Sequence, residues 1–172
     1  MELEQAIRTR RTHKVFSPEP VPARTLLALF ELARWAPNHH LTNPWRFRIL
    51  GPDTVARLKR LADAEKPGSG AKLDRAPTLV AASVLGEGDA VQQREDLLAG
   101  AVAAYLVLLA AHGLGLAGYW RTVTLLDTPA GREALGLDPA ETPIGLLHLG
   151  WPRQEQRVPE RAAVEAFVRT LP

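Results

Sequence analysis

The sequence contains no cysteine in its 172 residues. This absence excludes disulfides, thiolate nucleophiles and cysteine-ligated metal centres, and it is typical of a protein of the reducing cytoplasm, where we expect this one to be. An excess of one charge is also missing, since the net charge at pH 7 is only +2. The total charge therefore favours no general role in nucleic-acid binding. The first five residues are acidic and polar, unlike a secretory signal peptide.

Charged residues are absent from one long segment, Leu97 to Trp120. Its length alone would suffice to cross a membrane. However, it is rich in alanine, which contributes little to insertion, and Gly113, Gly115 and Gly118 would end a helix. We therefore expect no membrane span, and we predict a fully buried helix that is apolar on all sides.

The composition, with 46% hydrophobic and 23% charged residues, indicates one globular domain over residues 1–172 with a real core. Helical spacing and capping residues predict helices over 2–11, 23–35, 53 to about 63, 89–112, 128–136 and 159–171. The third of these helices would begin with Asp53 as its cap. Apolar β-like runs predict strands over 45–50, 78–85, 117–123 and 144–149. Residues 66–72 are expected to be a flexible, exposed linker. The order of these elements predicts a mixed α+β fold.

Several short motifs match functional signatures but lack the required context. Gly113–Gly118 matches G-x-G-x-x-G, yet a helix precedes it and a strand follows, so we interpret it as a helix stop and close-packed turn. Residues 66–72 lack the G-K-[ST] ending of a phosphate loop. His39 and His40 would point apart in an extended loop, and no further ligand spacing accompanies them, so we expect no metal site. There is also no G-x-S-x-G nucleophile elbow.

Basic side chains concentrate in Arg10–Lys14, which we call the basic segment. Arginine presents paired donors that match phosphate oxygens, and Thr12 adds a hydroxyl donor. The alternative is a solvated helix end whose cations complement the helix dipole. About two dozen residues later, a polar loop over 36–43 leads directly into Pro44-Trp45-Arg46-Phe47.

Together these two patterns resemble the N-terminal signature of the nitroreductase family of FMN oxidoreductases. The resemblance rests on Arg10-Arg11-Thr12 with Phe16, Ala36–Trp45, Trp120-Arg121-Thr122, Gly150-Trp151-Pro152 and Arg157-Val158-Pro159. It covers nearly the whole chain and is strongest for the short NAD(P)H nitroreductase branch. It implies a three-layer α+β fold, with a central, mostly antiparallel sheet between helices. It also implies an intertwined homodimer with FMN at the interface, in which the helix over 89–112 is central.

The resemblance also implies roles for particular residues. Arg10, Arg11 and Thr12 would bind the FMN phosphate and ribityl chain, with Lys14 near the phosphate or the pyrimidine edge. Asn38 and His39 would reach a cofactor bound mainly to the other subunit. The isoalloxazine would be lined by Trp120, Arg121 and Thr122, and Arg157, or else Arg153, would complete the phosphate site. The alternatives are a core aromatic for Trp120 and a surface ion pair for Arg121.

Three positions depart from the family pattern. Thr12 replaces a serine and keeps its hydroxyl. Asn43 replaces a glutamine before Pro-Trp. Trp35 takes a place where the short branch carries an arginine that touches the flavin, so Trp35 either packs on the ring or is merely structural.

The activity implied by the resemblance is hydride transfer from NAD(P)H to the flavin and on to a nitroaromatic, quinone or similar small acceptor, in ping-pong order. A cation near the flavin, Lys14 or Arg121, would stabilise its reduced form. Such a reaction needs no side-chain nucleophile, and the sequence offers none. One alternative is an oxygen-dependent flavin-using or flavin-cleaving enzyme on the same fold. Another is a non-enzymatic nucleic-acid-binding module that uses residues 8–14, although we expect neither nucleic acid nor membrane as a partner.

Overall fold

The computed structural model describes residues 1–172. The helices are α1 (Leu3–Thr9), α2 (Ala23–Ala33), α3 (Pro52–Glu65), α4 (Ala90–Gly113) and α5 (Pro129–Leu135), and the strands are β1 (Trp45–Ile49), β2 (Thr78–Leu85), β3 (Ala117–Arg121) and β4 (Glu141–Gly150). Short 3₁₀ helices are η1 (His39–Leu41), η2 (Gly70–Arg75), η3 (Thr124–Asp127) and η4 (Val164–Ala166). The strands form one sheet in the order β1-β2-β4-β3, with every neighbouring pair antiparallel. The predicted α+β class is confirmed.

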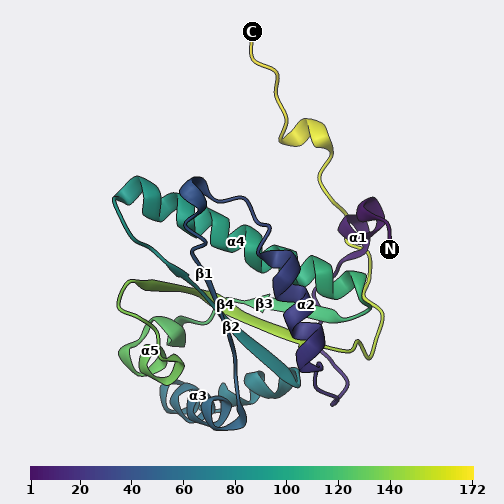
Figure 1. The fold of residues 1–172 in the computed structure, drawn as a ribbon. Helices are drawn as coiled ribbons and strands as arrows, with labels where there is room; N and C mark the ends of the chain where they lie inside the picture. The colour runs from purple at the N-terminus through teal and green to yellow at the C-terminus, as the bar shows by residue number, and fades with distance from the viewer.

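Helices cover both faces of the sheet, as Figure 1 shows, with α2 and α4 on one side and α3 and α5 on the other. One core cluster joins α2 and α4 to alternate strand residues such as Val80, Leu147 and Leu149. A second cluster joins α3 and the α5 region to the intervening residues, such as Leu79 and Leu146. Because side chains alternate along a strand, a sheet covered on both faces needs apolar residues at almost every position. This explains the continuous apolar run of β2 and confirms the three-layer arrangement.

Helix α4 begins at Asp89, whose carboxylate accepts hydrogen bonds of 2.9 Å from the backbone N–H groups of Val91 and Gln92. Small residues on its buried face, such as Gly100, allow close approach to the sheet, and a Cβ there would clash with Val84. By length and composition alone α4 could cross a membrane, but it packs on the sheet as a core helix.

The opposite face of α4 is exposed. Leu98 is 60% exposed, Val102 40% and Tyr105 36%. The prediction of a helix buried on all sides is therefore wrong for the single chain, because the sheet covers only one face of the helix.

The turn between α4 and β3 confirms the interpretation of the glycine motif. The helix ends at Gly113, and Gly115 has a φ of 79°, which glycine adopts without strain. A Cβ on Gly118 would lie 2.7 Å from the side chain of Leu108, so this strand start packs closely on the helix.

A buried ion pair ties the other end of the sheet together. Arg48 on β1 donates two hydrogen bonds of 2.7 Å to the carboxylate of Glu141 on β4, which also accepts one from Ser83 on β2. Burial alone would raise the pKa of Glu141, but these hydrogen bonds lower it to about 2. The pair crosses three strands and fixes their register at this edge.

Three local predictions are wrong, two of them around α3 and the third at the C-terminal end. Asp53 does not cap α3, because the helix begins one residue earlier with Gly51 as its cap and Pro52 in the first turn, where a missing N–H costs nothing. Residues 66–68 are exposed as predicted, but the segment 66–72 is not a free linker, because Gly70 is buried at the start of η2 and its N–H donates to Asp63 at 2.8 Å.

The predicted final helix over 159–171 is also absent. Beyond Pro152 the chain leaves the body as an arm whose only helical turn is η4 (Figure 1). Its apolar side chains are exposed, with Phe167 at 69% and Leu171 at 81%. A helix of this length is marginal without a surface to pack on, and residues 157–172 are exposed throughout.

Candidate functional site

The basic segment lies where β3 begins and β4 ends. After α1 the chain runs beside the sheet, where Thr12 forms a parallel bridge with Gly118 and the N–H of His13 donates to the Gly118 carbonyl at 3.1 Å. Farther along, Phe16 pairs with Pro152 in an antiparallel bridge. The structure therefore brings together two parts of the predicted site that are far apart in sequence, Arg10–Lys14 and Gly150–Pro152.

The arginines of this segment hold unused donors. The Arg10 guanidinium lies 5.6 Å from the centroid of the Tyr105 ring, and Arg11 donates to the backbone carbonyls of Arg8 and Arg10 at 2.7 and 2.8 Å. The Nε atoms of Arg10 and Arg11 are buried and have no partner. Because buried donors are normally paired, such atoms indicate a site for an anion with several acceptor oxygens.

No carboxylate neutralises the basic segment. Arg8, one turn earlier, pairs with Glu4 at 2.8 Å, whereas Arg10, Arg11 and Lys14 form no ion pair. A solvated helix end is therefore an adequate description of Arg8 but not of Arg10 and Arg11. The residues present fit a phosphate group.

Two histidines that the sequence did not assign to this site lie beside it. On the last turn of α4, Nε2 of His112 lies 2.8 Å from the hydroxyl of Thr9. Burial, then His112 and Arg10, lower the pKa of His13. Burial, then Arg10 and Arg11, lower the pKa of His112. The two rings and the two guanidiniums thus form one group, which we call the cationic cluster because its two arginines carry positive charge.

Strand β3 is an edge of the sheet, and the basic segment covers only its beginning. The Gly118 carbonyl points outward to His13, and backbone groups on a strand alternate in direction. The N–H and C=O of Trp120 therefore point to the same side, where no strand follows. We call Tyr119–Arg121 the open edge; it begins next to the phosphate-type site.

The side chains of Trp120 and Arg121 point to opposite faces of the sheet. The Trp120 indole packs against the α2–α4 cluster, and its N–H donates to the Ile144 carbonyl at 2.8 Å. This agrees with the alternative of a core aromatic, although the indole is only partly buried and also borders a hollow with Leu97 and Leu98. Successive side chains on a strand point to opposite faces of the sheet. The W-R-T motif alone does not show that its tryptophan and arginine are separated in this way.

Arg121 borders a cavity of about 440 Å³ on the α3 side of the sheet. Its floor is apolar, with Leu58, Leu73 and Leu146, and its polar lining includes Lys66, Ser69, Arg121 and Thr122. Burial lowers the pKa of Arg121, and no carboxylate pairs with it. The alternative of a surface ion pair is not observed. Sequence reasoning missed Lys66 and Ser69 because they fall in the supposed linker.

The loop over 36–43 is held by its own side chains. Asn38 accepts from the N–H of Asn43 at 2.9 Å and donates to the Ala36 carbonyl at 3.2 Å. The rings of His39 and His40 pack edge to face with their centroids 4.0 Å apart, so the prediction that they point apart is wrong. His40 has a φ of 54° because η1 is a tight turn and not an extended loop.

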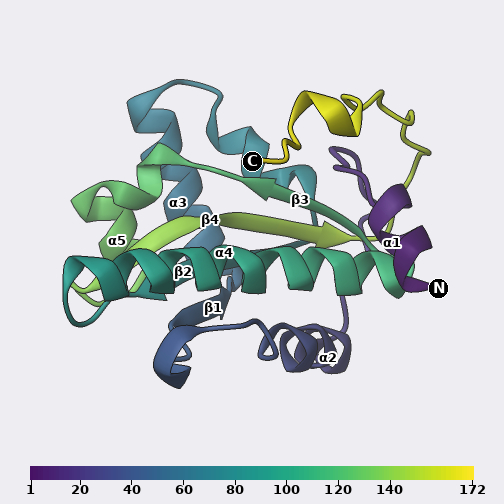
Figure 2. The same cartoon turned by 90° about the horizontal axis from the view of Figure 1, so that it is seen from above.

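This loop and the basic segment lie at opposite ends of α4 within one chain (Figure 2). Asn38 and His39 border a hollow with Glu95, Leu98 and Ala99, whereas the basic segment meets His112. Ala99 and His112 are thirteen positions apart on α4, which corresponds to about 20 Å along the helix axis. A single chain therefore does not join the two halves of the predicted site.

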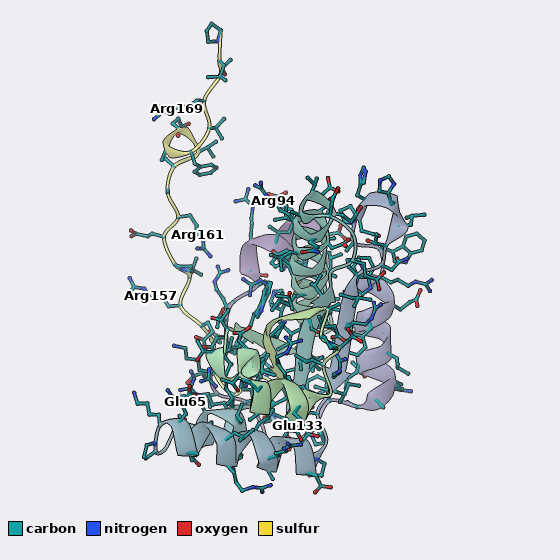
Figure 3. The ribbon with its side chains drawn as sticks, turned by 90° about the vertical axis from the view of Figure 1, so that its left-hand side faces the viewer. Glu65, Arg94, Glu133, Arg157, Arg161 and Arg169 are labelled. Carbon is teal, nitrogen blue, oxygen red and sulfur yellow. The ribbon has the colours of Figure 1, made fainter.

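Two further predicted residues are isolated. Trp35 is 77% exposed after the end of α2. Arg157 lies on the arm and is exposed, as are Arg161 and Arg169 (Figure 3). In this chain neither residue contributes to the cationic cluster.

Comparisons with known proteins agree with this architecture. A family model described as the nitroreductase family matches residues 7–68 and 54–151. YfhC of Bacillus subtilis, which carries an NAD(P)H nitroreductase name, is 27% identical over 94% of this chain and 90% of its own length. A nitroreductase-like protein from Bacillus cereus shares the fold with a TM-score of 0.90 at 20% identity, over 99% of this chain and 96% of its own.

A nitroreductase-type structure from Desulfovibrio desulfuricans, solved in complex with FMN, has a TM-score of 0.80 at 24% identity, over 98% of this chain and 97% of its own. The family model alone spans most of the chain, from residue 7 to residue 151. The protein belongs to the nitroreductase family.

Proposed function

We propose that this protein is an FMN-dependent oxidoreductase that uses NAD(P)H to reduce a small-molecule acceptor. The observation that carries the proposal is the unpaired cationic cluster at the start of the open edge of β3. When bound, FMN supplies the redox chemistry, taking hydride from NAD(P)H and reducing a nitroaromatic, quinone or similar acceptor in ping-pong order. The names of the relatives and the FMN complex of a structural neighbour support this assignment.

The chain's own residues bind and orient the cofactor. Arg10, Arg11 and Thr12 hold the phosphate with charge-assisted hydrogen bonds, and Lys14 adds a further cation. The backbone groups of the open edge would be available to hydrogen-bond the bound cofactor. Arg121 lines the 440 Å³ cavity together with Thr122, and its guanidinium would supply positive charge near the ring, where reduction adds negative charge.

We also propose that the working unit is an intertwined homodimer with FMN at the interface. The exposed apolar face of α4 needs a cover, and the separation of His39 from the basic segment is resolved if a second copy supplies it. In a two-fold arrangement, the Asn38–His39 loop of each chain meets the basic segment of the other. Trp35 and Arg157 complete the site in the same way, by lying against the second copy. A cytoplasmic location stays a prediction.

The first test is the absorbance of the purified protein, with and without added FMN. We expect a flavin band near ~450 nm that remains after gel filtration. The protein should elute as a dimer, and truncation after Pro152 should weaken both dimer and flavin retention. No flavin band after FMN addition would refute the proposal.

The second test separates this reaction from an oxygen-dependent one. Oxidation of NADH and NADPH is followed anaerobically with a nitroaromatic and with a quinone. Turnover without oxygen supports the proposal, whereas turnover that requires oxygen contradicts it. The same screen identifies the preferred nucleotide and acceptor.

A further inference from the structure

Two histidines, His13 and His112, lie beside the proposed phosphate ligands Arg10 and Arg11. His13 lies within the basic segment, and His112 reaches it from the last turn of α4. Nδ1 of His13 is buried and has no hydrogen-bond partner, like the Nε atoms of Arg10 and Arg11. Three neighbouring residues of the segment therefore hold a polar ring or guanidinium nitrogen without a partner.

The charged groups nearest to these rings are cations. The charged and titratable groups around them are Arg10 and Arg11 from the end of α1, Lys14 beyond them, and Tyr105 on α4 under Arg10. None of these cations is paired with a carboxylate. Without an anion, burial and then repulsion by the neighbouring cations lower the pKa of both imidazoles, which favours their neutral forms near pH 7. A bound dianion reverses this balance, because it attracts a proton to each ring.

We propose that His13 and His112 are additional residues of the phosphate site and that they take up protons when a phosphate monoester binds. The inference rests on the proposed function. In the free protein, neutral rings reduce the repulsion with the guanidiniums of Arg10 and Arg11. In the complex, protonated rings add positive charge beside the bound phosphate. Phosphate affinity should therefore rise as the pH falls from about 8 to about 6.5, above the phosphate's own second pKa of about 6.

The pKa values in the free protein agree in direction. Both are lowered from the ordinary value of 6.5. Protons are therefore absent from the free rings at neutral pH and are available to be gained on binding. Each histidine whose pKa rises by one unit on binding tightens the affinity by up to about tenfold across the transition.

Calorimetry tests the proposal on the unmodified protein. FMN is titrated at pH 7.5 in phosphate-free buffers with different ionisation enthalpies, and the slope gives the protons taken up. We expect net uptake with FMN and none with riboflavin, which lacks the phosphate. FMN binding without proton uptake would overturn the inference but leave the proposed function intact, whereas absence of FMN binding would remove both.

Variants locate the protons. The double variant His13→Gln, His112→Gln should lose the proton uptake, and its FMN affinity should no longer tighten as the pH falls from about 8 to about 6.5. The matched control Arg8→Ala changes an exposed residue that pairs with Glu4 outside the cluster, and it should keep both the uptake and the pH dependence. Carbon-bound imidazole proton shifts of the five histidines give a second readout. Uptake that persists in the double variant would refute the assignment to these two rings.

Discussion

Replacing Arg10 by alanine tests whether this arginine binds the FMN phosphate. The Nε of Arg10 is buried without a partner, and the guanidinium is fixed 5.6 Å above the Tyr105 ring. A charge-assisted hydrogen bond to phosphate contributes about 1.5–3 kcal/mol, so FMN affinity should fall by about 10- to 150-fold. Loss of the cation–π contact should lower the free energy of unfolding by only about 0.5–1 kcal/mol. The effect on binding should therefore exceed the effect on folding.

The assay is a titration that follows quenching of flavin fluorescence, for FMN and riboflavin in parallel. Arg8→Ala is the matched control, because Arg8 lies two residues away and its ion pair with Glu4 is more than 70% exposed. Such a pair contributes at most about 1 kcal/mol. We expect Arg8→Ala to leave FMN affinity unchanged and Arg10→Ala to leave riboflavin affinity unchanged. Unaltered FMN affinity in Arg10→Ala, or an equal loss for riboflavin, would refute the reasoning.

Three predictions concern stability. Glu141→Gln should lower the free energy of unfolding at pH 7 by about 3–5 kcal/mol, because it leaves Arg48 without its buried partner. The carboxylate's contribution is complete above its ordinary pKa of 4.5 and is lost as the pH falls toward 2, so urea unfolding of the two proteins should converge in acid. Gly145→Ala should cost about 1–3 kcal/mol, because Gly145 has a φ of 134° and a Cβ there would lie 2.8 Å from Trp120 Nε1; a lower thermal midpoint with shifted tryptophan fluorescence checks this. His148 is fully buried, both ring nitrogens lack partners, and burial followed by nearby arginines lowers its pKa to about 4. Its unfolded form binds a proton below pH 6.5, so stability should fall from pH 6.5 toward 4, and His148→Leu should abolish that fall and raise stability at pH 7 by about 1–3 kcal/mol; an unchanged pH profile would contradict this.

The order and type of the elements followed from local patterns. The apolar run of 78–85 predicted β2 with its observed bounds, and Thr128 with Gly136 marked both ends of α5. Turn glycines and capping side chains act within a few residues, so the sequence displays them directly. The arm was mispredicted for the same reason. Its helical periodicity is local, but a helix also needs a surface, and the surface is not local.

The chemical character of the site, an arginine pair with a hydroxyl followed by a polar loop, can be recognised from residue types alone, and so can the family. Which of these residues lie together depends on the packing of distant segments. The tertiary structure placed Arg10 and Arg11 beside His112, roughly a hundred positions away in the chain, and put Trp120 and Arg121 on opposite faces. It also showed that His39 lies about 20 Å along α4 from the basic segment. Residue types are properties of single positions, whereas proximity, burial and unpaired donors depend on packing between distant segments.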